Sequence, residues 1–119
     1  MILMDDTGIA HLNCFGGPID TPNFDRLANG GLRFANFHTT ALCSPSRACL
    51  LTGRNHHAVG MRAISNFDTG FPNMRGRIAP EAATIAEMLG PKGWSTFCVG
   101  KWHLAPIMEA STAGPFHNW

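Results

Sequence analysis

The chain has 119 residues, of which 45% are apolar and 14% are charged, and its formal net charge is +1. A chain of this length forms at most one domain, and this composition is that of a soluble globular protein. The near-neutral charge gives no reason to expect nucleic acid or an anionic membrane as a partner. No segment reaches the roughly 18 apolar residues of a membrane span.

The first third of the chain predicts a helix between two strands. Residues 2–4 form a short apolar run, as in a strand that is buried on both faces. Thr21 is a candidate N-cap, Pro22 suits the first helical position, and glycines 30–31 are expected to end the helix. Residues 32–37 predict the second strand.

The same alternation continues in the rest of the chain. Pro45 is expected to open a helix that ends at Gly53, and residues 55–78 have the glycines and prolines of a long loop. A helix over residues 81–89 and a strand over residues 94–99 follow. Alternating strands and helices predict an α/β fold, in which a largely parallel sheet forms the middle of a three-layer sandwich.

The chain has four cysteines, which lack the paired spacing of a zinc site and the density of a disulfide scaffold. We expect Cys14, Cys49 and Cys98 to be small buried apolar side chains, and a disulfide among them is left open. The adjacent His56 and His57 have no matching set of ligands around them, so they are expected to lie in a surface loop.

Cys43 differs from the other cysteines in the residues that follow it. It begins a C-x-P-x-R pattern just before the helix expected at Pro45. Backbone N–H groups at a helix start favour negative charge and would activate a nucleophile at this position. Arg47 lies about one helical turn further on, so its guanidinium can reach back over Cys43. Within the pattern, Ser46 is expected to cap the helix, and Ser44 to shape the backbone.

Asp5 and Asp6 follow the first predicted strand, and their carboxylates suit a hard divalent cation such as Ca²⁺ or Mg²⁺. Adjacent side chains on a strand point to opposite faces. Both carboxylates can therefore bind one ion only if the strand ends there and the backbone turns, which Gly8 makes easier.

Lys101 and His103 follow the last predicted strand and would lie on the same side of an extended segment. Lys101 offers a positive charge for an anion, and His103 can donate a hydrogen bond or assist proton transfer. Ligand sites of open α/β sheets lie at the carboxyl ends of strands. We therefore expect the acidic pair, residues 39–44 and residues 100–103 to converge at one edge of the sheet.

Five segments of the chain together resemble the sulfatase family, and arylsulfatases in particular, within the alkaline phosphatase superfamily. They occur in the family's order and cover nearly the whole chain. These are D-D-x-G at residues 5–8, T-P-N-x-D-x-L-A at 21–28, C-x-P-x-R at 43–47, L-L-T-G-R at 50–54 and V-G-K-W-H-L at 99–104.

The resemblance implies a specific chemistry for the candidate residues. A maturation enzyme would oxidise Cys43 to formylglycine, whose hydrate attacks the sulfur of a sulfate ester. Asp5 and Asp6 would bind Ca²⁺, with the modified Cys43 as a further ligand, while Lys101 and His103 hold the sulfate and Arg47 supports the nucleophile. The expected reaction is hydrolysis of a sulfate ester to an alcohol or phenol and sulfate.

The resemblance also implies that residues 1–119 are the N-terminal part of a longer catalytic domain. The family's later Asp-Asn metal pair, second histidine and second lysine have no counterpart in this sequence. Two alternatives stay open at this point. One is a phosphonate or phosphate monoester hydrolase of the same superfamily, and the other is a truncated, catalytically silent chain. The sequence leaves the alcohol part of the substrate and the cellular compartment open.

Overall fold

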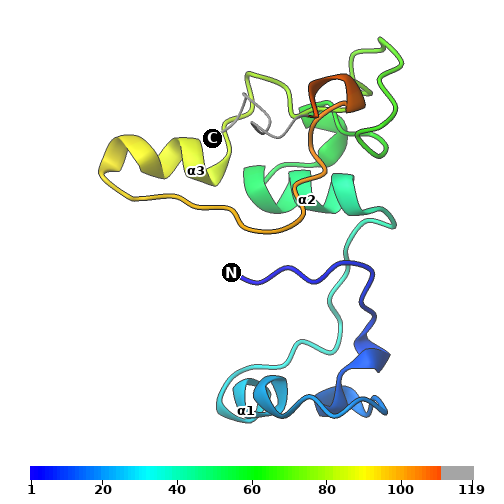
Figure 1. Cartoon of the computed structure of the whole chain (residues 1–119), viewed down its shortest axis with the longest axis vertical. Coiled ribbons are helices and arrows are strands. Elements are labelled where there is room, and N and C mark those ends of the chain that lie inside the picture. Colours follow the sequence, from blue (N-terminus) through cyan, green and yellow to red (C-terminus); the bar gives the residue numbers. More distant parts are fainter. Residues whose placement is uncertain (111–119) are drawn as a thin grey trace. The chain divides into compact units, whose positions relative to one another are not determined.

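The computed structural model describes residues 1–110 and divides the chain into two compact units, Met1–Thr39 and Thr40–Trp119 (Figure 1). The first unit contains helix α1 (Pro22–Gly30), and the second contains α2 (Cys43–Thr52) and α3 (Ile85–Leu89). Short 3-10 segments occur before α1 at Ile9–His11 and Asn13–Phe15, between α2 and α3 at His56–Val59, and after α3 at Gly90–Lys92 and Ile107–Glu109.

Helix α1 begins and ends where the sequence predicted. Thr21 is its N-cap residue and Pro22 its first residue, and the helix ends at Gly30. The Thr21 side chain does not cap the helix backbone. Its Oγ1 instead accepts a hydrogen bond from the backbone N–H of Asn13, at 3.1 Å, and donates one to Asp25 at 3.3 Å. These bonds tie the start of α1 to the 3-10 segment before it.

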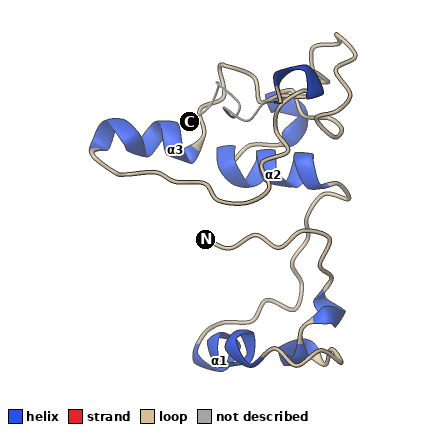
Figure 2. Cartoon of the chain, viewed as in Figure 1, coloured by secondary structure: helices blue, strands red, loops and turns tan. Residues whose placement is uncertain are grey.

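The three predicted strands are wrong for the part of the chain that is described. Residues 2–4, 32–37 and 94–99 form no strand, residues 35–36 bend, and the single isolated bridge within residues 1–110 joins Met61 and Met74 (Figure 2). A strand exists only where a neighbouring backbone completes its hydrogen bonds, whatever its side chains favour. Val99, for example, is 98% exposed. The three-layer sandwich accordingly stays a prediction.

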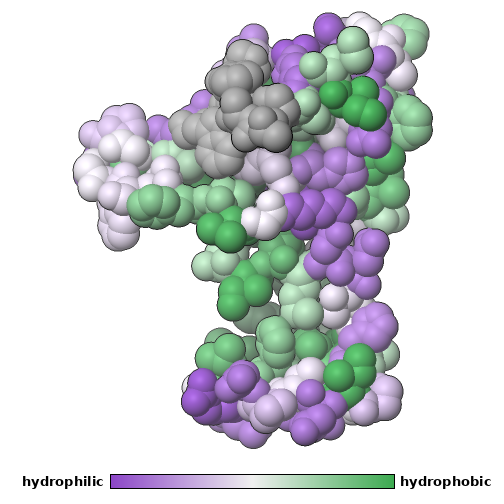
Figure 3. Space-filling view, in the orientation of Figure 1, coloured by the Kyte–Doolittle hydropathy of each residue, from purple (hydrophilic) through white to green (hydrophobic). Residues whose placement is uncertain are grey.

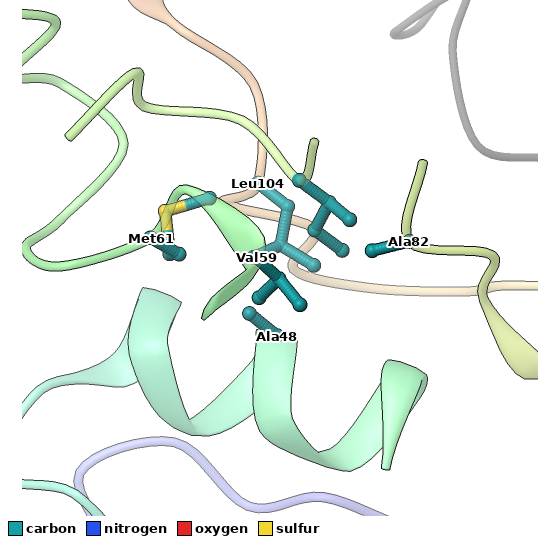
Figure 4. Packing of buried hydrophobic residues seen from close by; sticks show 6 residues of the cluster. Ala48, Val59, Met61, Ala82 and Leu104 are labelled. Carbon is teal, nitrogen blue, oxygen red and sulfur yellow. The ribbon is translucent and has the colours of Figure 1, made fainter. Parts of the chain in front are cut away.

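The core of the second unit lies against helix α2 (Figure 4). Ala48 projects from α2 toward side chains from the loop after it and from the segment near residue 104. Leu51 and Trp102 pack against this core from its edge. The buried members are Ala48, Val59, Met61, Ile78, Ala82 and Leu104. Burial of Leu104 and Trp102 thus holds the predicted anion-binding segment near α2.

Helix α2 begins at Cys43, two residues before the predicted start at Pro45. Pro45 is therefore the third helical residue, where its missing N–H has no helical partner to lose. The helix ends as predicted, because Gly53 takes a left-handed conformation (φ 65°) and its N–H bonds to the Cys49 carbonyl at 2.8 Å.

Helix α3 is shorter than the predicted span of residues 81–89. It begins at Ile85 because Thr84 and Glu87 form a reciprocal capping box. The Thr84 N–H donates to the Glu87 carboxylate at 2.7 Å, and the Glu87 N–H donates to the Thr84 hydroxyl at 3.3 Å. The loop predicted over residues 55–78 is observed, apart from the 3-10 segment His56–Val59.

No helix within residues 1–110 combines the length and apolar character that crossing a membrane requires. Apolar side chains nevertheless reach the surface of the chain (Figure 3). Cys98 is among the exposed residues, so the expectation that it is buried is wrong, and Cys14 and Cys49 are half-buried. All four cysteines are free thiols.

Candidate active site at the start of helix α2

Cys43 and His103 meet at the first turn of α2. The Cys43 Sγ lies 3.2 Å from His103 Nδ1, although the two residues are 60 positions apart in the chain. Cys43 is half-buried, and Leu42 precedes it as the N-cap residue. Residues 39–44 and 100–103, two of the three segments that were expected to converge, therefore do meet. They meet at the start of a helix, and no sheet edge is formed there by residues 1–110.

A third residue, Asn66, completes a chain of contacts through the imidazole. The other ring nitrogen of His103, Nε2, lies 3.0 Å from the Asn66 Oδ1. Asn66 could not be predicted from the sequence, because it lies in an irregular loop 37 residues before His103 and belongs to no pattern. His103 itself has a φ of 53°, a left-handed backbone conformation that is uncommon for a residue with a side chain. The segment that carries His103 was predicted to be extended, and its backbone differs from that prediction at His103.

Arg47 connects α2 to the segment that carries Lys101 and His103. Its Nη1 donates a hydrogen bond to the Lys101 carbonyl oxygen at 2.6 Å, and the residue is only 8% exposed. This contact fixes the backbone beside His103. That the guanidinium also reaches back over Cys43 stays a prediction. The Lys101 residue is exposed.

The two serines of the C-x-P-x-R pattern hold the surroundings of Cys43. The hydroxyl of buried Ser44 accepts a hydrogen bond from the backbone N–H of buried Ser65, at 3.2 Å. Ser46 does not cap the helix, and that prediction is wrong because the early helix start places it within the first turn. Its hydroxyl lies 2.7 Å from the Thr40 hydroxyl, and this contact fixes the residues that lead into α2.

Asp5 and Asp6 belong to the first unit, where both are exposed. The backbone turns at Asp6 itself, which has a φ of 50°, while Gly8 keeps an ordinary extended φ of −88°. Two carboxylates at a turn offer the oxygen ligands that Ca²⁺ and Mg²⁺ prefer. Within residues 1–110, however, no group of three His, Cys, Asp or Glu side chains is arranged to hold a metal ion. The described residues therefore supply at most part of a metal site.

The adjacent histidines of the loop also give no metal site. Their rings lie 4.2 Å apart between centroids, and His56 Nδ1 is 2.9 Å from the Met61 carbonyl oxygen. This contact gives His56 a place in the packing of the second unit. A surface loop was expected for both residues, but they begin the 3-10 segment His56–Val59, where His57 is exposed and His56 half-buried.

Comparison with known proteins identifies the class of protein. The sulfatase family model matches residues 1–119. The chain is 42% identical to human arylsulfatase A, over 100% of this chain and 24% of that protein. It is 34% identical to the arylsulfatase of Klebsiella aerogenes (93% and 24%) and 38% identical to human steryl-sulfatase (94% and 20%). The chain therefore belongs to the sulfatase family, as its motifs predicted.

Family membership implies an α/β fold of the alkaline phosphatase type. The chain spans only 20% to 24% of the length of the three relatives named above.

Proposed function

We propose that the protein hydrolyses sulfate esters and that residue 43 carries the nucleophile. The observation that supports this most is the 3.2 Å contact between Cys43 Sγ and His103 Nδ1 at the start of α2. A nucleophile within hydrogen-bond reach of a base is the arrangement that covalent catalysis requires. The similarity to arylsulfatases and a steryl-sulfatase favours a sulfate ester as the substrate.

The nucleophile that we propose is formylglycine, made from Cys43 by a separate maturation enzyme. The hydrated aldehyde would present a hydroxyl oxygen where the unmodified residue has Sγ. His103 Nδ1, facing that position, is suited to accept the hydroxyl proton. The exposed Lys101 would place its ammonium group against a sulfate oxygen.

Arg47 has a positioning role in this proposal. Its hydrogen bond to the Lys101 carbonyl joins the helix that carries the nucleophile to the segment that carries the base. Because the guanidinium is buried and charged, this bond is stronger than a bond between neutral groups. The distance between residue 43 and His103 then depends on the hydrogen bond from Arg47 to Lys101, and Arg47 does not need to contact the substrate to have this role.

Asp5 and Asp6 are proposed as ligands of a divalent cation, Ca²⁺ in the first place and Mg²⁺ as the other choice. Their support is chemical: two carboxylates at a backbone turn suit a hard cation. The remaining ligands would include the modified residue 43 and residues outside this sequence. Such a cation, when bound, lowers the pKa of a coordinated hydroxyl and neutralises anionic oxygens. In this proposal residues 1–119 are the N-terminal part of the catalytic domain.

The test compares substrates and variants of the full-length protein produced together with a formylglycine-generating enzyme. We expect turnover of an aryl sulfate in preference to the matching aryl phosphonate and phosphate. Cys43→Ala should abolish this turnover, whereas Cys49→Ala, in the same helix, should retain most of it. Preference for the phosphonate or phosphate ester would support the related hydrolases instead. Full activity of the Cys43→Ala variant would contradict the assignment of the nucleophile.

A further inference from the structure

We propose that Asn66 is a positioning residue that fixes the tautomer of His103. Its side-chain oxygen holds the proton of the imidazole on Nε2, so that Nδ1 presents a lone pair to residue 43. The importance of this role for catalysis rests on the proposed function. The position of the proton on the His103 ring is independent of that function, and it can be measured in protein that is not turning over substrate.

The two contacts of the ring carry this inference. Asn66 Oδ1 lies 3.0 Å from Nε2, and Cys43 Sγ lies 3.2 Å from Nδ1. An amide oxygen can only accept a hydrogen bond, so Nε2 must carry the hydrogen. In a neutral imidazole the other nitrogen is then an acceptor. The ring is thereby set to receive a proton from residue 43 rather than to donate one to it.

The backbone next to Asn66 is fixed against the nucleophile helix. The N–H of Ser65 donates to the hydroxyl of Ser44, which directly follows Cys43. A turn closed by the hydrogen bond from Phe67 N–H to the Ile64 carbonyl, at 3.2 Å, carries Asn66 at its third position. The amide is therefore placed by the same helix that places residue 43.

Gly76 secures the other side of the Ser65 backbone. It has a φ of 67°, and a Cβ at this position would collide with the Ser65 carbonyl oxygen. Ser65 itself is fully buried. Close packing on both sides leaves the segment little freedom to move, which is a requirement for a residue that orients a catalytic group.

The backbone of His103 is itself strained. A left-handed conformation costs a residue with a side chain about 1–2 kcal/mol, so surrounding contacts must hold it. Contacts at both ring nitrogens, together with the burial of Leu104 next to it, supply such a constraint. Strain of this kind is concentrated at functional sites, where geometry matters more than local stability.

The first experiment measures the tautomer directly. In full-length protein with unmodified Cys43 and ¹⁵N-labelled histidine, NMR should show His103 protonated at Nε2 and unprotonated at Nδ1. Asn66→Ala should give a mixture of both tautomers. Asn73→Ala is the matched control, because Asn73 is exposed in the same loop and its side chain bonds to no other residue among those described. Protonation at Nδ1 in the wild type, or an unchanged tautomer in Asn66→Ala, would overturn the proposal.

The second experiment tests the consequence for catalysis in the mature enzyme. General acid–base catalysis contributes about 10²–10⁴-fold, and we expect Asn66→Ala to lose about 10- to 100-fold of this in kcat with KM little changed. Asn66→Asp keeps an oxygen acceptor and should recover much of the loss. An unchanged kcat in Asn66→Ala would contradict the positioning role. If the wild type hydrolyses no sulfate ester, the proposed function fails, while the NMR result still decides the tautomer.

Discussion

The two units of the chain differ in how much of their structure they stabilise by themselves. The second unit contains the hydrophobic core of six residues that is found within residues 1–110, whereas the helices of the first unit bury no residue. Large apolar side chains are exposed in both units, for example Ile2 and Leu32 in the first and Phe97 and Val99 in the second, so only the buried core distinguishes the units.

This difference explains which parts of the candidate site are well defined. Cys43, His103 and Asn66 occupy fixed positions because α2 and the segment around residue 104 share one core. Asp5 and Asp6 lie in a unit that has no comparable core. Local sequence is sufficient to form a turn or a short helix, but the distance between two catalytic groups depends on buried contacts.

The largest expected effect contrasts one apolar side chain from each unit. In the 119-residue chain, Met61→Ala should lower the free energy of unfolding by about 2–5 kcal/mol, because Met61 is 0% exposed and its loss leaves a cavity. Leu27→Ala, at a side chain that is 64% exposed, should change it by no more than about 0.5 kcal/mol. Urea denaturation measures both values.

An equally large loss in Leu27→Ala would show that the first unit has a core of its own, contrary to this account. The same pair in the full-length protein sharpens the comparison. A larger effect of Leu27→Ala there than in the 119-residue chain would mean that other residues cover the apolar surface of the first unit.

Two arginines give a matched polar comparison. Arg47 and Arg33 each donate a hydrogen bond of 2.6 Å to a backbone carbonyl, of Lys101 and Cys14 respectively. Arg47→Ala should cost about 1.5–3 kcal/mol of stability, because the guanidinium is buried and leaves a carbonyl without its partner. Arg33 is exposed, so Arg33→Ala should cost no more than about 0.5 kcal/mol. Similar losses at both positions in urea denaturation would argue against this contrast.

Two glycines within the second unit separate backbone strain from crowding. Gly70 and Gly76 both have positive φ, of 77° and 67°, but only at Gly76 would a Cβ meet another atom. Gly70→Ala should cost the conformational penalty of about 1–2 kcal/mol. Gly76→Ala should cost about 1–3 kcal/mol more, because it also displaces Ser65. If thermal unfolding gives equal losses, the Ser65 backbone is not confined as described.

The smallest effect concerns the pH dependence of stability. Hydrogen bonds from the Gly70 N–H and the Arg75 side chain lower the pKa of Asp68. The ionised carboxylate therefore stabilises the folded state above the pKa that Asp68 has in the unfolded chain. This contribution is lost as the pH falls through the lower, folded-state pKa. Asp68→Asn should flatten the acid side of the stability curve slightly, because the group is exposed. A steeper acid side would contradict the assignment.

Several helix ends and the contact between Cys43 and His103 could be predicted from the sequence. Pro22 and Gly53 set their helix boundaries through local backbone chemistry, so the predictions there are confirmed within a residue. The start of α3 depended on Thr84 and Glu87, a capping box that was present in the sequence but was not used. The meeting of residues 43 and 103 was expected because both segments follow predicted strands, and it is observed although those strands are not.

The rest of the fold could not be derived from residue patterns. The apolar runs at residues 2–4, 32–37 and 94–99 indicate what a strand would bury, but not whether a neighbouring strand is present. Asn66 carries no local signal, since its role depends on a contact with a residue 37 positions away. The hydrogen bond from Arg47 to a backbone carbonyl likewise could not be predicted from the sequence, because every residue has such a carbonyl.

The most direct test of the account is the chemical state of residue 43 in protein from its native host. Mass spectrometry of the peptide spanning residues 40–54 should find an aldehyde in place of the Cys43 thiol, while Cys49 in the same peptide remains a thiol. An unmodified Cys43 in protein that turns over sulfate esters would contradict the proposed oxygen nucleophile.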